Sequence, residues 1–226
     1  MPFINIIWYI FIGFLPGLFW LWFYYKKDLH PEPLKWLFKV FVWGIMAAVP
    51  AVVIELLADA LLLNYVDEAS LVYICLSTFL VVAPAEEVMK FLVVRRTVFN
   101  EPVFDEKIDG VIYAIAAGLG FATFENILAA IGSGENIVIA RGITATLLHA
   151  TAAGLMGYFL GLAKFQPKRR GWLMAAGLLS AIIVHGLYNF VITLDSELTI
   201  PLIIVLLTIV YVILAIGIRK MRRLEV

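Results

Sequence analysis

Long apolar stretches dominate the chain, and short polar connections separate them. A helix needs roughly 20 mostly apolar residues to cross about 30 Å of hydrocarbon. Seven stretches reach that length, at about residues 3–25, 36–63, 70–95, 108–131, 138–163, 172–194 and 199–218. The pattern therefore predicts an all-α bundle of seven membrane-spanning helices, forming a single domain over residues 1–226.

The placement of basic residues supports this count, because Lys and Arg collect in the cytoplasmic connections of membrane proteins. All of the 17 Lys and Arg residues except Arg141 lie at alternate connections, in residues 26–39, 90–107, 164–170 and 219–223. The intervening connections carry acidic residues instead. This pattern predicts an N-terminus outside the cell membrane and a C-terminus in the cytoplasm.

Composition excludes several classes of protein. Hydrophobic residues make up 63% of the chain and charged residues 15%, against about 45–50% and 25% in soluble domains. The 17 basic residues balance 17 acidic ones, so no basic excess suggests nucleic acid as a partner. The single cysteine, Cys75, excludes an internal disulfide and a cysteine-based zinc cluster. We expect a multi-pass protein of the cell membrane, surrounded by lipid.

Polar and ionisable residues inside the predicted spans point to function, because each charged one costs about 2.5–3.5 kcal/mol on insertion scales. They gather in the third to sixth spans, as Glu86, Glu87, Lys90, Glu125, Asn126, His149, His185 and Asn189. Small residues recur four positions apart on the same helical faces, which lets helices pack closely. We therefore expect these polar groups to point into the bundle and to share one pocket near the middle of the membrane.

The adjacent carboxylates suggest acid–base chemistry. Two carboxylates in a low-dielectric setting do not both ionise readily, so one of Glu86 and Glu87 is expected to hold a proton. Lys90 lies three and four residues later and can keep the other carboxylate charged. A carboxylate in such a setting can act as a general base that takes a proton from water.

The two histidines leave two versions of this chemistry open. His149 and His185, with a carboxylate from Glu87 or Glu125, would bind Zn²⁺ and activate a water molecule. Without metal, the imidazoles and Asn189 would stabilise the oxyanion that forms when water attacks an amide. Either version predicts hydrolysis inside the membrane.

Four motifs occur in order within these spans: Glu86-Glu87-x-x-Lys90, Phe121-x-x-x-Glu125-Asn126, His149-x-x-x-Ala153 and His185-x-x-x-Asn189. Together they resemble the motifs of PrsW-type intramembrane proteases. These proteases belong to a larger group with the type II CAAX-processing endopeptidases and the bacterial abortive-infection proteins. The likeness covers about residues 80–190, and the segment from Phe104 to Tyr113 also resembles that subgroup.

The resemblance implies a membrane-embedded endopeptidase. Its role would be the site-1 cut of a single-pass anti-sigma factor, on the extracytoplasmic side, which starts a stress response by regulated intramembrane proteolysis. Residue by residue, it assigns the glutamate pair to Glu86 and Glu87 and the essential histidine to His185. Glu125 and His149 would complete the site, and Lys90 and Asn126 would support it. The last motif ends in Asn189, where some relatives have Asp.

Other functions fit the same residues. Carboxylates and histidines within spans also relay protons in transporters and proton-coupled carriers. Two further alternatives are a non-catalytic helper of another membrane protein and an enzyme that processes a CAAX-like membrane peptide. Outside the motifs, Glu55 and Asp59 lie four apart on the second span, and we expect them to form a structural ion pair with Arg141. The alternative is that these residues gate substrate entry.

Overall fold

The computed structural model describes residues 3–26, 30–194 and 196–223. Seven of the helical stretches in this part of the chain are long and apolar enough to cross a membrane. They are Ile6–Tyr25, Leu34–Leu62, Leu71–Thr97, Asp109–Ser133, Asn136–Phe165, Pro167–Thr193 and Thr199–Arg222. The prediction of an all-α bundle with seven spans is confirmed.

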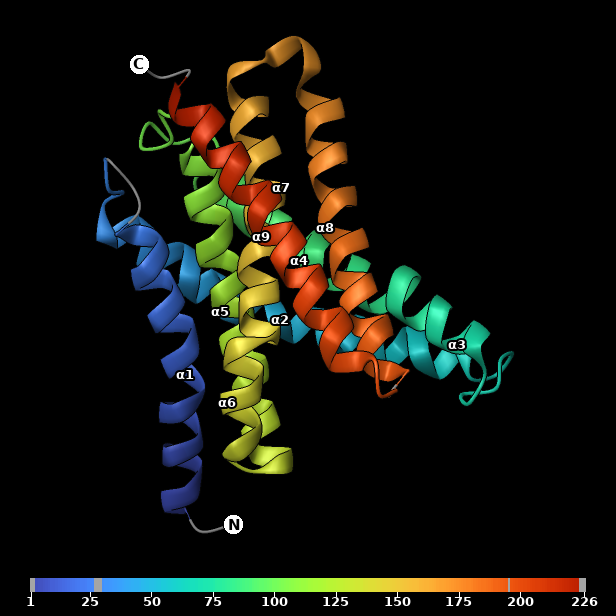
Figure 1. Ribbon diagram of the computed structural model, residues 1–226. Helices are drawn as coiled ribbons and strands as arrows, with labels where there is room; N and C mark the ends of the chain where they lie inside the picture. Colours follow the sequence, from blue (N-terminus) through green and yellow to red (C-terminus); the bar gives the residue numbers. More distant parts are fainter. Residues whose placement is uncertain (1–2, 27–29, 195, 224–226) are drawn as a thin grey trace.

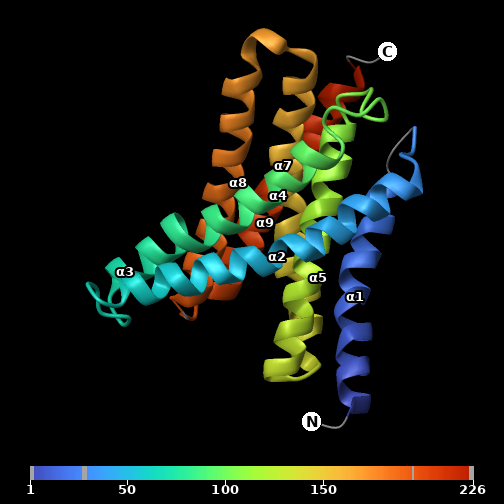
Figure 2. The ribbon, with the colours of Figure 1, turned by 180° about the vertical axis from the view of Figure 1, so that it is seen from behind.

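The helices follow one another along the chain with short connections. In order they are α1 (Phe3–Tyr25), α2 (Leu34–Leu62), α3 (Leu71–Leu76), η1 (Ser77–Val82), α4 (Ala83–Thr97), α5 (Asp109–Ser133), α6 (Asn136–Ile143), α7 (Ala145–Phe165), η2 (Pro167–Arg169), α8 (Arg170–Thr193) and α9 (Thr199–Arg223). Helices α5 and α7 pack side by side at the centre of the bundle (Figure 1). Helix α2 and the α3–η1–α4 segment run obliquely across them, as seen from behind (Figure 2).

The third and fifth spans are broken, which the apolar pattern does not predict. In the third span, the π-helical segment η1 lies between α3 and α4, and Pro84 is the second residue of α4. Proline has no amide hydrogen to donate to the preceding turn, and π segments often mark functional positions. In the fifth span, the chain departs from regular helical geometry at Thr144, between α6 and α7. Both breaks lie next to the polar residues of the spans.

Glycines bring α5 and α7 into close contact. A Cβ atom added at Gly157 would collide with the backbone oxygen of Gly110, and one at Gly161 with that of Lys107. A Cβ at Gly118 would lie 2.6 Å from the backbone oxygen of His149. The predicted small-residue faces of these two spans therefore do pack against each other.

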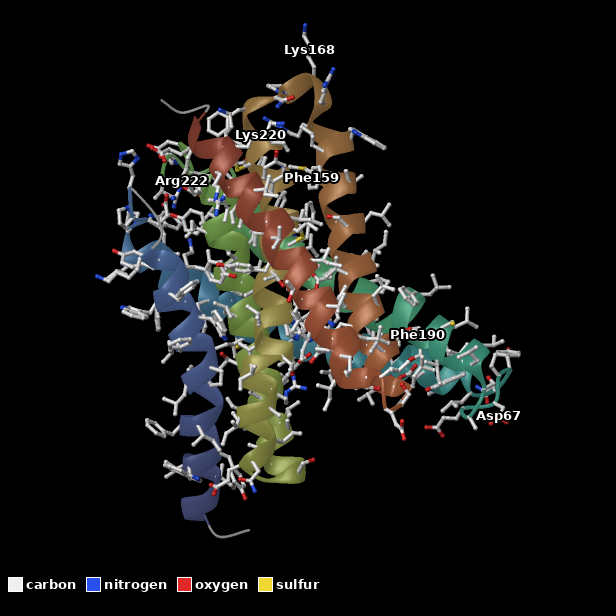
Figure 3. All side chains as sticks on the ribbon, in the orientation of Figure 1. Asp67, Phe159, Lys168, Phe190, Lys220 and Arg222 are labelled. Atoms are coloured by element: carbon white, nitrogen blue, oxygen red, sulfur yellow. The ribbon has the colours of Figure 1, made fainter. Side chains whose placement is uncertain are left out.

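The outer faces of the bundle are apolar, and the charged connections lie at its ends. Large side chains such as Phe19, Trp22 and Leu57 are more than half exposed, as expected for residues that contact lipid. Lys168, Lys220 and Arg222 lie at the end of the bundle where α7 meets α8 (Figure 3).

The two ends of the chain differ in position. The start of α1 and the end of α9 lie at opposite ends of the bundle (Figure 1), as seven spans require. Lys27 and Asp195, which belong to the predicted charge pattern, lie outside the described residues, as does the side chain of Arg223. Which end faces the cytoplasm remains a prediction.

Candidate active site

Four helices bring the predicted polar residues together. Helix α4, which crosses α7 and α8 (Figure 2), carries the two glutamates and Lys90, and α5, α7 and α8 carry Glu125, His149 and His185. Glu86 lies in the first turn of α4, just after η1. Residues three and four apart share a helical face, so Lys90 reaches back to both glutamates.

The Lys90 ammonium lies at the centre of the cluster. Its Nζ atom is 3.0 Å from Oε2 of Glu86, 2.7 Å from Oε1 of Glu87 and 2.8 Å from Nδ1 of His149. It also lies 4.4 Å from the centre of the Phe121 ring. The Lys90 and Glu87 side chains are fully buried, and that of Glu86 is 5% exposed. Their charges are therefore balanced within the protein and not by water.

His185 closes the cluster from α8. Its Nδ1 lies 2.7 Å from Oε1 of Glu87, and its Nε2 lies 3.7 Å from Oε1 of Glu86. The rings of His149 and His185 are 5.0 Å apart and nearly perpendicular. Both imidazoles are buried, as predicted, and both face the glutamate pair of α4.

Glu125 forms an outer part of the same network. Its Oε2 lies 3.1 Å from Nε2 of His149 and accepts a hydrogen bond from Nη2 of Arg141 at 2.7 Å. Its neighbour Asn126 accepts a hydrogen bond from Nε of Arg141 at 2.9 Å and donates one to Thr146 at 3.0 Å. The side chains of Glu125 and Arg141 are 23% and 26% exposed.

The expected ion pair of Arg141 with Glu55 and Asp59 is wrong. Arg141 bonds Glu125 and Asn126 instead, while Asp59 accepts a hydrogen bond from Ser77. One carboxylate oxygen of Glu55 is buried without a hydrogen-bond partner among the described residues. The broken fifth span explains the difference, because α6 carries Arg141 toward α5 and not toward α2.

Asn189 is the one predicted site residue that the structure does not join to the cluster. It lies one turn beyond His185 on α8 and is half-buried. Its backbone oxygen accepts a hydrogen bond from Thr193, but none of the hydrogen bonds found among the described residues joins its side chain to the cluster. A role for Asn189 stays a prediction.

The buried groups meet the requirements of a metal site. One ligand atom from each of Glu86, Glu87, His149 and His185 lies within 4.8 Å of the others. Carboxylate oxygen and imidazole nitrogen are ligands that zinc takes in proteins. Oε2 of Glu87 is buried and has no hydrogen-bond partner among the described residues. The donor set therefore fits a metal ion. It includes His149, His185 and Glu87 as the sequence suggested, and has Glu86 in place of Glu125.

Sequence reasoning missed Arg141 and Thr146 as members of this network. Arg141 did carry a signal, because it alone breaks the alternation of basic connections. The charge pattern disfavours a basic residue in a connection predicted to lie outside the cell, so such a residue needs a partner nearby. Here the partner is the carboxylate of Glu125. Thr146 carries no comparable signal in the sequence.

In comparisons with known proteins, one family model matches most of the chain. The model of the PrsW family of intramembrane metalloproteases matches residues 32–217. The protease PrsW of Geobacillus kaustophilus (strain HTA426) is 34% identical over 181 residues, covering 79% of this chain and 76% of that protein.

Two further relatives show the same likeness. The protease PrsW of Clostridioides difficile (strain 630) is 33% identical over 210 residues, covering 88% of this chain and 84% of that protein. The protease PrsW of Bacillus subtilis (strain 168) is 31% identical over 187 residues, covering 82% and 83%. No solved structure matches the chain. This multi-pass membrane protein therefore belongs to the PrsW family of intramembrane metalloproteases, and is a peptide hydrolase.

Proposed function

We propose that this chain cuts a single-pass anti-sigma factor on its extracytoplasmic side, using water activated at the glutamate pair of α4. The observation that carries the proposal is the buried cluster of Glu86, Glu87, His149 and His185, whose ligand atoms lie within 4.8 Å of one another. In this proposal the seven spans form one protease domain, because the cluster draws on helices from several of them.

The chain's own residues supply the acid–base chemistry in this account. A glutamate of α4 takes a proton from the attacking water and later passes it to the leaving amine. Lys90 holds both carboxylates in place through its two hydrogen bonds to them. Asn189 is proposed to bind the oxyanion, one turn beyond His185.

The metal has a defined place in this account. His149, His185 and one of the two glutamates of α4 are the residues that would hold a zinc ion, which would supply Lewis-acid chemistry at the scissile carbonyl. The other glutamate then stays free to act as the base. His185 is oriented for this by the carboxylate of Glu87 at its Nδ1. The relatives' family supports a metal, since its members are described as metalloproteases.

The exposed edge of the network supports a cut on the extracytoplasmic side. The cluster is buried, whereas the side chains of Glu125 and Arg141 are about one quarter exposed. Arg141 belongs to the connection between α5 and α7, which the charge pattern assigns to the outer side. A substrate that approaches past this pair would place its extracytoplasmic juxtamembrane segment nearest the glutamates.

The experiment is co-expression of tagged single-pass anti-sigma factors with the wild-type chain and its variants. Glu86→Gln, Glu87→Gln and His185→Gln are compared at matched membrane levels, and Glu68→Gln, on an exposed connection, is the control. We expect a product with the wild type and the control only, cut on its extracytoplasmic side. A product that persists in all three site variants would exclude the cluster as the site. Cleavage of another single-pass protein but of no anti-sigma factor would overturn the substrate assignment alone.

A further inference from the structure

Arg141 makes two hydrogen bonds that fix adjacent residues of α5. Its Nη2 donates to Oε2 of Glu125 at 2.7 Å, and its Nε donates to Oδ1 of Asn126 at 2.9 Å. A guanidinium is planar, so two bonds from different nitrogens fix the direction of both acceptors. The Glu125 carboxylate is therefore held in one orientation at the edge of the cluster.

Glu125 in turn acts on His149. Its Oε2 lies 3.1 Å from Nε2 of His149, while the other ring nitrogen, Nδ1, lies 2.8 Å from the Lys90 ammonium. An ammonium only donates and a carboxylate only accepts. The two partners thus require the ring hydrogen on Nε2 and the lone pair on Nδ1.

That lone pair points into the site. Nδ1 of His149 lies 3.8 Å from Oε2 of Glu86, beside the Lys90 ammonium that donates to it. A histidine that binds a metal through one nitrogen commonly donates from the other to a carboxylate, which fixes both the tautomer and the orientation of the ring. Glu125 has the position of that carboxylate.

The fold holds Arg141 in place from outside the site. Helix α6 is separate from α7 and packs against α1. Trp20 of α1 donates from its indole nitrogen to the backbone oxygen of Gly142 at 3.0 Å. The ring of Pro16 lies against the same glycine, 3.0 Å from where its Cβ would be. These contacts with α1 therefore fix the position of α6, and with it the position of the Arg141 guanidinium.

We propose that Arg141 is a positioning residue of the active site: acting through Glu125, it orients His149 so that Nδ1 faces the glutamate pair. The proposal rests on the proposed function, because it takes the cluster as the site of hydrolysis. It differs from a surface ion pair, which would contribute little to stability and nothing to the chemistry.

The first test reads the tautomer directly and needs no activity. The chain has three histidines, so nitrogen NMR of imidazole-labelled full-length protein in micelles gives three rings, and His149→Gln assigns that of His149. We expect the wild-type ring of His149 to carry its hydrogen on Nε2. Arg141→Gln keeps the Lys90 bond to Nδ1 but frees the Glu125 carboxylate to move, so we expect the Nε2 resonance to shift and its hydrogen to exchange faster with water. An unchanged Nε2 resonance and exchange rate in Arg141→Gln would overturn the proposal, even if the chain cleaved no substrate.

The second test uses cleavage kinetics with any single-pass substrate that the wild type cuts. Loss of a partner of this kind typically costs 10–100-fold in activity, so we expect Arg141→Gln to lower kcat by about that factor, with KM nearly unchanged. Arg169→Gln, on the exposed α7–α8 connection, is the matched control. Added guanidinium ion is expected to restore part of the lost rate, since the Arg141 side chain is partly exposed.

A conservative variant guards against simple misfolding. Arg141→Lys keeps the charge but cannot make both planar hydrogen bonds. We expect it to melt at the wild-type temperature and to have a kcat between those of wild type and Arg141→Gln. Full activity in Arg141→Lys, or a loss in Arg141→Gln that guanidinium does not reverse, would contradict positioning by the guanidinium. Absence of cleavage by the wild type would instead count against the proposed function.

Discussion

Lys90 supplies the positive charge that the buried carboxylates need. Its ammonium bonds both Glu86 and Glu87, and its side chain is fully buried. Removing one partner of a buried ion pair costs about 3–5 kcal/mol, because it leaves an uncompensated charge. We expect Lys90→Met to lower the melting temperature in detergent markedly, while Lys35→Met, at an exposed position, leaves it unchanged.

The same variant bears on the metal. Because a divalent cation would restore the missing positive charge, zinc is expected to raise the melting temperature of Lys90→Met more than that of the wild type. Chelation should reverse the effect. An equal response of both proteins to zinc would show that the ion does not bind at these carboxylates.

The sequence predicts the identity of the buried groups better than their partners. Glu86, Glu87, His149 and His185 stand out because ionisable residues within apolar spans are costly, and the structure brings all four together. Arg141 was assigned to the wrong partners. Its position along the chain indicates its depth in the membrane, but the break at Thr144 decides which helix it faces.

At the scale of helices, the contact between α5 and α7 sets the distance from Glu125 to His149. A Cβ at Gly118 would lie 2.6 Å from the backbone oxygen of His149 and 2.8 Å from the Cβ of Ala153. The backbone oxygen of His149 cannot move away without its helix, so Gly118→Ala must push α5 and α7 apart. We expect at least a tenfold loss of cleavage rate. We also expect a lower melting temperature, because overpacking a core lowers stability.

Helix α5 also offers a matched control. A Cβ at Gly132 would meet nothing within 4 Å, and alanine is the better helix former by about 0.5–1 kcal/mol. Gly132→Ala is therefore expected to retain full activity and to melt at the wild-type temperature or slightly above. Equal behaviour of the two variants would show that the α5–α7 spacing does not govern the site.

Helix type and number were predictable because a lipid-facing span needs a long apolar run. The breaks were harder to foresee. A hydropathy pattern does not distinguish a π segment such as Ser77–Val82, or the irregular backbone at Thr144, from a regular α-helix. Both depend on how neighbouring helices satisfy backbone groups, which is a property of the packed bundle.

At the scale of the whole molecule, the charge pattern predicts that the α7–α8 connection lies in the cytoplasm and the α2–α3 connection outside. Lys168 and Asp67 are exposed on these two connections and lie in different parts of the bundle (Figure 3). In a Cys75→Ser background, we expect Asp67→Cys to react with an impermeant thiol reagent in intact cells. Lys168→Cys should react only after permeabilisation, and the reverse pattern would invert the topology.

The most direct test of the central claim uses the purified chain in liposomes, with a labelled single-pass protein as substrate. The claim is that the buried glutamate–histidine cluster performs the hydrolysis. Losing a general acid–base group costs about 10²–10⁴-fold, so Glu87→Gln should cleave at least a hundredfold more slowly than the wild type. His185→Gln removes a proposed zinc ligand and should lose as much activity. Glu68→Gln should equal the wild type. Wild-type rates in both site variants, at matched reconstitution, would contradict the account.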